Sequence, residues 1–141
     1  MQDIARERSL EIDQAGFEML VALEGLDKAM VDDIVLGCAM PEGEQGMNVS
    51  RIALLRAGLP YTVTGQTINR FCSSGLQSIA LAAQAIRAGD AQCILAGGFE
   101  SMSNIPYALP KARDGYRLGN GELVDLLPRE TTGRGQVVGR P

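Results

Sequence analysis

Strand-like and helix-like segments alternate along this chain, and the alternation constrains the fold more than any other feature. Short runs of β-branched and aliphatic residues are typical of strands, and the stretches between them have helical spacing of apolar residues. The expected strands are 33–37, 62–69 and 92–97, and the expected helices are 9–26, 49–59 and 73–88. Connections of helix length join parallel strands through right-handed crossovers. The pattern therefore predicts an α/β fold, with a mostly parallel sheet covered by helices.

The segment 73–88 carries the strongest helix signal. It contains no proline, and Gly89 follows it as a typical helix stop. Its apolar residues form a wide face that consists of Leu76, Ile79, Ala80, Ala83 and Ile86. Only a narrow polar stripe remains, so we expect this helix to be largely buried, with Leu76 and Ile79 in the core. Asn48 is the expected N-cap of the preceding helix.

Composition excludes several classes of protein. The chain has 13 basic and 17 acidic residues, a net charge of −4, so we expect no nucleic acid partner. It has no apolar run of the ~20 residues that a membrane span needs. The N-terminus has no signal-peptide pattern, which predicts a cytoplasmic protein. The 141 residues include no histidine and no Cys-x-x-Cys, so we expect no metal site.

Cys72 is the candidate for chemistry because it lies where a predicted strand meets the predicted helix 73–88. Unpaired N–H groups and the helix dipole at such a terminus favour an anionic sulfur, which is the nucleophilic form. The alternative for Cys72 is a buried structural thiol, since free cysteine is among the most buried residue types. We expect Cys38 and Cys93 to be core thiols, because each lies in or beside a predicted strand.

Two longer segments resemble a known family. The run NRFCSSGLQSIALAAQAIRAGDAQCILAGGFESMSNIPY resembles the nucleophile segment of the thiolases, and VDDIVLGCAMPEGEQGMNVSRIALLRAGLP resembles the strand, loop and helix that precede it. The resemblance extends from about Val31 to about Leu127. The forms NRFCSSGLQ and EGEQG look more like the branch that degrades fatty acids through 3-ketoacyl-CoA thiolysis. The implied fold is the N-terminal half of a thiolase.

The resemblance implies an activity and a set of substrates. Cys72 would be the catalytic residue, taking the acyl group of a 3-ketoacyl-CoA as a thioester before coenzyme A accepts it. The backbone N–H of Cys72 would contribute to an oxyanion hole. Acyl-CoA and coenzyme A are then substrates, no metal or covalent cofactor is implied, and a homo-oligomer is expected. The coenzyme-binding residues stay unassigned.

The chain departs from the family in ways that predict a fragment. Residues 1–127 are expected to be a thiolase N-terminal domain truncated at its start and before its end, and 128–141 a divergent, disordered tail. In thiolases the second half supplies the histidine that activates the nucleophile. The alternative function is therefore a non-catalytic fragment, or a half-enzyme that needs a C-terminal partner. Another condensing enzyme of the superfamily is a weaker possibility.

Several smaller features keep open readings. Gly75 provides either room for an acyl thioester or close packing of two backbones. EGEQG at 42–46 could be a charged cluster for acid/base chemistry, but we expect a solvated loop. GGFESMS at 97–103 is either the ligand-binding end of a strand or a tight turn, and the resemblance implies a structural role near the active site and the subunit contact. Residues 100–120 are predicted to be a long loop, and ELVDLL at 122–127 a short helix. The glycines at 133–140 do not have the spacing of a dinucleotide site.

Overall fold

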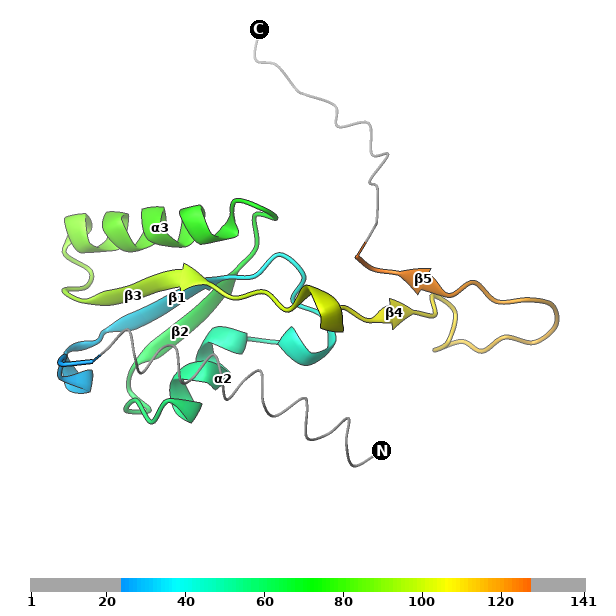
Figure 1. Ribbon diagram of the computed structural model, residues 1–141, viewed down its shortest axis with the longest axis horizontal. Helices are drawn as coiled ribbons and strands as arrows, with labels where there is room; N and C mark the ends of the chain where they lie inside the picture. The colour runs from blue at the N-terminus through cyan, green and yellow to red at the C-terminus, as the bar shows by residue number, and fades with distance from the viewer. Residues whose placement is uncertain (1–23, 128–141) are drawn as a thin grey trace, which may run out of the picture. The chain divides into compact units, whose positions relative to one another are not determined.

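The computed structural model describes residues 24–127 (Figure 1). The predicted helix 9–26 therefore lies outside the described residues, except for 24–26, which form a turn. The predicted tail 128–141 lies outside them as well. The chain divides into two compact units, Met1–Ile105 and Pro106–Pro141, and each is described by itself below.

The first unit is built on a parallel three-stranded sheet. Its strands are β1 (Asp33–Gly37), β2 (Thr64–Ile68) and β3 (Ile94–Gly98), in the order β2-β1-β3. The central strand β1 is the most buried, because it has a neighbour on each side and a helix on each face. The predicted α/β architecture with parallel strands is confirmed, and the strand bounds differ from the prediction by no more than two residues.

Helices cover both faces of this sheet. In Figure 1, α2 (Val49–Arg56) lies on one side and α3 (Ser74–Ala88) on the other. The side chain of Asn48 accepts a hydrogen bond from the Arg51 N–H, so the predicted N-cap of α2 is confirmed. Gly89 ends α3 with a left-handed φ of 83°, a conformation that glycine adopts without steric cost.

The main hydrophobic core lies on the α2 side of the sheet. Ile34 and Leu36 alternate with Val35 along β1 and therefore point to the same face. The cluster they form consists of Val31, Ile34, Leu36, Ala53, Leu54, Ala57, Leu59 and Val63. Such aliphatic packing fits a chain with no tryptophan and few aromatic residues.

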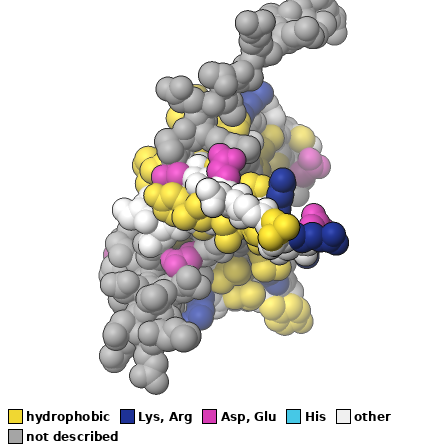
Figure 2. Space-filling model, turned by 90° about the vertical axis from the view of Figure 1, so that its right-hand side faces the viewer, with side chains coloured by type: hydrophobic (Ala, Val, Ile, Leu, Met, Phe, Trp, Pro, Cys, Tyr) yellow, Lys and Arg dark blue, Asp and Glu magenta, His cyan; other side chains and the backbone are white. Residues whose placement is uncertain are grey.

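The other face is packed through small residues, and this overturns the prediction for α3. The residues that α3 buries are Ser74, Ser78 and Ala82, which recur every four residues and share one face. Leu76 is 73% exposed, Ile79 is 54% exposed and Ile86 is 43% exposed. The helix lies close to the sheet along this face, and the side chains that it buries there are small. Leu76, Ile79 and Ile86 face outward, whereas Leu81 is half-buried. Figure 2 shows one face of the molecule, on which hydrophobic side chains lie at the surface among charged ones.

The second unit, as far as it is described, contains a small antiparallel pair. Strand β4 (Tyr107–Ala108) pairs with β5 (Val124–Asp125), and most of the segment between them is loop and turn. The predicted helix 122–127 is wrong, because Val124 and Asp125 extend to pair with β4.

The loop predicted for 100–120 includes residues of both units. It contains a short 3-10 helix, Met102–Asn104, in the first unit and β4 in the second, and is otherwise irregular. Within the described part of the chain, no helix has the length and apolar character of a membrane span.

Candidate active site

Cys72 lies in the five-residue turn between β2 and α3, and its side chain is exposed. The turn reverses at Phe71, whose φ of 49° is in the left-handed region. The Phe71 N–H donates to Asn69 Oδ1 at 2.9 Å, and the Ser74 N–H donates to the Phe71 carbonyl at 3.0 Å. Cys72 thus precedes Ser73, the N-cap of α3, and lies directly at the start of the helix.

Two serines stabilise the helix side of this turn. Ser74 Oγ donates to the Phe71 carbonyl at 2.6 Å and accepts from the Arg70 N–H at 2.8 Å. Ser73 Oγ donates to the Arg70 carbonyl at 2.8 Å. These bonds satisfy polar backbone groups that a sharp turn leaves without sheet or helix partners. The hydroxyls of Ser73 and Ser74 therefore stabilise the backbone of the turn that carries Cys72.

Glycines bring the start of α3 against the ends of two strands. A Cβ on Gly37, the last residue of β1, would lie 2.4 Å from the Ser74 carbonyl carbon, which excludes any larger residue there. A Cβ on Gly98, at the end of β3, would lie 3.7 Å from Gly75 Cα. A Cβ on Gly75 itself would meet nothing within 4 Å, so open space lies on that side. Both readings of Gly75 therefore keep support, because its Cβ side is open, whereas its backbone N would lie only 2.6 Å from a Cβ on Gly37.

A second thiol, Cys38, lies at the same edge of the sheet as Cys72, because Cys38 follows β1 and Cys72 follows β2, which is parallel to it. Cys38 is fully buried. Its Sγ lies 3.7 Å from Gln45 Oε1 and 3.8 Å from Glu100 Oε1. Burial, followed by the negative charge of Glu100, raises the pKa of Cys38 to about 11. A thiol of that pKa stays protonated at neutral pH, which agrees with the prediction that Cys38 is a core thiol.

Gln45 and Glu100 join the loop after β1 to the segment after β3, a role that no sequence pattern predicts. Gln45 lies in the loop and contacts Ser101, and Glu100 lies in the segment and contacts Ala39 and Met40. Gln45 is 1% exposed, although EGEQG was predicted to be solvated. Its amide donates to the Ser101 carbonyl at 3.0 Å and accepts from the Ser101 N–H at 2.6 Å. A fully paired glutamine leaves no periodic signal in a Gly-rich loop, so the sequence pattern could not reveal it.

Cys93 lies at the opposite edge of the sheet, because it precedes β3. Its N–H donates to the Asp32 carboxylate at 3.0 Å, and the Gln92 N–H donates to the same oxygen at 2.7 Å. These two backbone hydrogen bonds lower the pKa of Asp32. Cys93 is partly buried and packs against the main core, as expected of a structural thiol.

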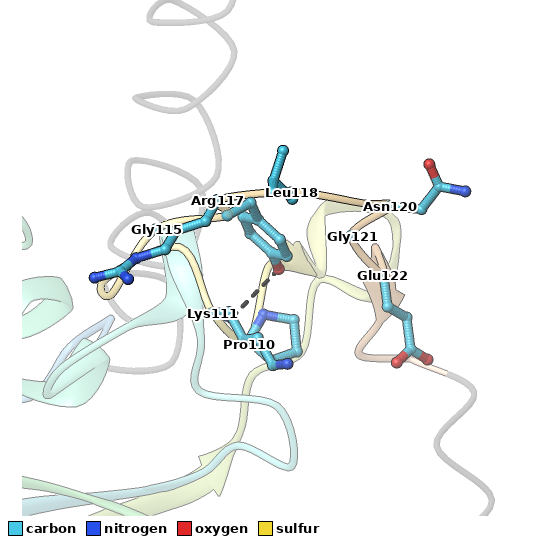
Figure 3. A pocket seen from close by; sticks show the side chains of 9 residues that line it. Pro110, Lys111, Gly115, Arg117, Leu118, Asn120, Gly121 and Glu122 are labelled. Atoms are coloured by element: carbon cyan, nitrogen blue, oxygen red, sulfur yellow. Dashed lines mark hydrogen bonds between the residues drawn. The ribbon is translucent and has the colours of Figure 1, made fainter.

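The second unit contains a hollow of about 450 Å³ between residues 110 and 122 (Figure 3). Lys111 and Arg117 bring positive charge to its lining, and Glu122 brings negative charge. The amide of Asn120 points away from it in Figure 3. The Lys111 N–H donates to the Tyr116 hydroxyl at 3.3 Å, which closes one side. Its charges do not converge on one point, and we assign it no ligand.

The first unit therefore defines a class of protein, an α/β domain that presents an exposed thiol at a strand-to-helix turn. Comparison with known proteins identifies the family. The profile of the thiolase N-terminal domain matches residues 4–137, and the chain belongs to this family.

Relatives and solved structures agree with the profile. An acetyl-CoA acetyltransferase of Escherichia coli K12 is 52% identical over 106 residues, which are 74% of this chain and 27% of that protein. The 3-oxoadipyl-CoA/3-oxo-5,6-dehydrosuberyl-CoA thiolase of the same organism is 50% identical over 70% of this chain and 25% of its own length. The crystal structure of the Bacillus anthracis acetyl-CoA acetyltransferase has 42% identity and a TM-score of 0.72 over 82% of this chain and 29% of that one. The chain thus spans less than a third of each of these relatives.

Proposed function

We propose that this chain is the nucleophile-bearing domain of a thiolase-type acyltransferase, and that Cys72 is its catalytic residue. The observation that carries the proposal is the position of Cys72, exposed on the turn between β2 and α3 in a domain of the thiolase family. Cys38 is a poor alternative because its thiol is buried and its pKa is raised. Cys93 lies at the other edge of the sheet.

The reaction proceeds in two transfers. The Cys72 thiolate attacks the 3-keto carbon of a 3-ketoacyl-CoA, and the bond between carbons 2 and 3 breaks. A proton then converts the released carbanion into acetyl-CoA. The thiol of coenzyme A attacks the Cys72 thioester, which forms the shortened acyl-CoA and regenerates the Cys72 thiol. The backbone N–H of Cys72 contributes to the oxyanion hole that stabilises each tetrahedral intermediate.

The proton transfers need a base and an acid that this chain does not offer as imidazole, since its 141 residues include no histidine. We therefore propose that turnover requires a polypeptide beyond these 141 residues, either a longer chain or a separate partner. The large apolar residues exposed on α3 support this proposal, because exposed apolar faces mark surfaces that another element covers. A homo-oligomer is part of the same proposal.

The substrate class follows from the motifs, because NRFCSSGLQ and EGEQG favour a 3-ketoacyl-CoA of fatty-acid degradation. The cytoplasm is the proposed setting, since the three cysteines are free thiols. The names of the relatives include acetyl-CoA acetyltransferase and a 3-oxoadipyl-CoA thiolase, so the acyl chains within the family differ. Thiolysis rates with acetoacetyl-CoA and with longer 3-ketoacyl-CoAs, measured after addition of a thiolase C-terminal half, decide between them.

The direct test of Cys72 is acylation of the chain itself. Incubation with acetyl-CoA should add one acetyl group to the intact mass, and peptide mapping should locate it on Cys72. Cys72→Ala should abolish the modification, whereas Cys93→Ala, the matched removal of another thiol, should leave it. A chain that stays unmodified both alone and with a C-terminal half would contradict the proposal and favour the alternative, a non-catalytic fragment.

A further inference from the structure

The Glu100 carboxylate connects the segment after β3 to the loop after β1. Its Oε2 accepts a hydrogen bond from the Ala39 N–H at 2.6 Å, and its Oε1 accepts one from the Met40 N–H at 3.2 Å. Hydrogen bonds between an ionised carboxylate and backbone N–H groups are among the stronger ones in proteins. Glu100 therefore fixes the backbone of Ala39 and Met40 relative to the sheet.

The same loop is hydrogen-bonded to the turn that carries Cys72. Asn69 Nδ2 donates to the Ala39 carbonyl at 2.9 Å, and Asn69 Oδ1 accepts from the Phe71 N–H at 2.9 Å. Asn69 thus uses both ends of its amide, one on the loop and one on the turn. A continuous chain of hydrogen bonds extends from Glu100 through Ala39 and Asn69 to Phe71, which precedes Cys72.

Phe71 is the strained point of this chain of hydrogen bonds. Its φ of 49° is unfavourable for a bulky aromatic residue, and such a conformation persists only where surrounding contacts hold it. The Phe71 side chain is 65% exposed, so packing of its ring contributes little to holding the backbone. The hydrogen bond from the Phe71 N–H to Asn69 Oδ1 is therefore one of the contacts that hold this backbone conformation.

We propose that Asn69 and Glu100 are positioning residues for Cys72. Glu100 holds the Ala39 carbonyl in place, and that carbonyl orients the Asn69 amide. Asn69 in turn stabilises the left-handed Phe71 and keeps the Cys72 sulfur at the start of α3. This inference rests on the proposed function, since the nucleophilic role of Cys72 is what makes its position matter.

Two substitutions interrupt the chain of hydrogen bonds at different points. Asn69→Asp keeps an oxygen that accepts from the Phe71 N–H, and it places a second oxygen against the Ala39 carbonyl in place of a donor. Glu100→Gln replaces one acceptor of a backbone N–H by an NH₂ group. The matched control is Asn48→Asp, which keeps the cap on the Arg51 N–H but loses the 2.7 Å bond that Asn48 donates to the Gly65 carbonyl of β2.

The measurement is alkylation by iodoacetamide, with the rates at Cys72 and Cys93 taken from the same sample by peptide mapping. Asn69→Asp and Glu100→Gln should each lower the ratio of the Cys72 rate to the Cys93 rate by roughly two- to fivefold, because the turn no longer holds the exposed Cys72 side chain at the start of α3. Hydrogen exchange of peptides that span 69–76 should become faster in both. Asn48→Asp should lower the urea midpoint and leave the ratio unchanged.

The double variant distinguishes a connected chain from two independent effects. If Glu100 acts through Asn69, then Asn69→Asp combined with Glu100→Gln should match the stronger single variant. Additive effects, or a Cys72 to Cys93 ratio equal to that of the wild-type chain, would overturn the proposal. If Asn69→Asp exposes Cys38 to the reagent, Asn69→Ser is measured in its place, since its hydroxyl still accepts from the Phe71 N–H. Failure of Cys72 to accept an acetyl group would contradict the proposed function alone, because alkylation does not depend on it.

Discussion

The Ser78 hydroxyl of α3 donates a hydrogen bond to the Gly97 carbonyl of β3 at 2.7 Å, and Ser78 is fully buried. The same hydroxyl lies 2.6 Å from the Gly75 carbonyl one turn earlier in the helix. A serine at the centre of a helix–sheet contact is unusual on the basis of hydrophobicity. It fits here because α3 lies too close to the sheet for a larger side chain.

Substitution at Ser78 tests this close approach. Ser78→Ala should lower the free energy of unfolding by about 0.5–1.5 kcal/mol, since one buried hydrogen bond is lost. Ser78→Leu should cost more, about 1–3 kcal/mol, because the larger side chain forces α3 away from β3. Urea unfolding of both variants gives the comparison, and Ser103→Leu in the 3-10 helix Met102–Asn104, where Ser103 is exposed, is the control. A Ser78→Leu variant as stable as wild type would contradict the close packing.

The two apolar environments of the first unit should differ sharply in their effect on stability. Leu54→Ala should destabilise the chain by about 2–5 kcal/mol, because Leu54 is a residue of α2 whose side chain is fully buried in the main core. Leu76→Ala removes the same atoms from an exposed position and should change stability by less than about 0.5 kcal/mol. Equal losses in urea unfolding would show that α3 is covered in solution.

Self-association should depend on the outward face of α3. The double variant Leu76→Ser with Ile79→Ser removes two large exposed apolar side chains, so the fraction of oligomer should fall. Sedimentation velocity over a range of concentrations measures this. The control is Leu118→Ser with Leu123→Ser, which removes two exposed leucines from the second unit. An equal fall in the control would assign the association to general surface hydrophobicity.

Stability should depend on pH through Asp32. Hydrogen bonds from the Cys93 and Gln92 N–H groups lower its pKa in the folded chain. The stabilisation they confer is therefore present above the unfolded pKa and is lost as the pH falls through the folded pKa. Asp32→Asn should thus reduce the urea midpoint at neutral pH, and the difference from wild type should shrink below about pH 4. Asp90→Asn controls for the loss of one exposed carboxylate, and a difference that stays constant with pH would contradict the assignment.

The three thiols should react in a defined order. With limiting iodoacetamide at neutral pH, Cys72 should be labelled first, because it is exposed at the start of α3. Cys38 should be labelled last, since burial and the Glu100 charge raise its pKa to about 11. Peptide mapping over time gives the order. Early labelling of Cys38 in a chain that retains its circular dichroism spectrum would contradict the buried position.

Local signals predicted the elements well, because each of them acts over a few residues. Asn48 before an apolar-periodic segment marked the start of α2, and Gly89 marked the end of α3. The strand predicted at 92–97 is observed at Ile94–Gly98. The predicted helix 122–127 failed because β5 is stabilised by pairing with β4, a contact across 16 residues or more that propensity within the segment does not contain.

The sequence by itself determined the order of helices and strands, the parallel sheet and the place of Cys72 between β2 and α3. Its family motifs also determined which chemistry to expect. Only the tertiary structure decided which side of α3 is buried, since the helix has an apolar face and a small-residue face and both could pack. It also decided that Glu100 and Asn69 meet through Ala39, because residues 30 and more positions apart come together only when the sheet forms. Periodicity predicts which faces of a helix could be buried. Which face is buried, and against which strand, depends on contacts between segments that are far apart in the sequence.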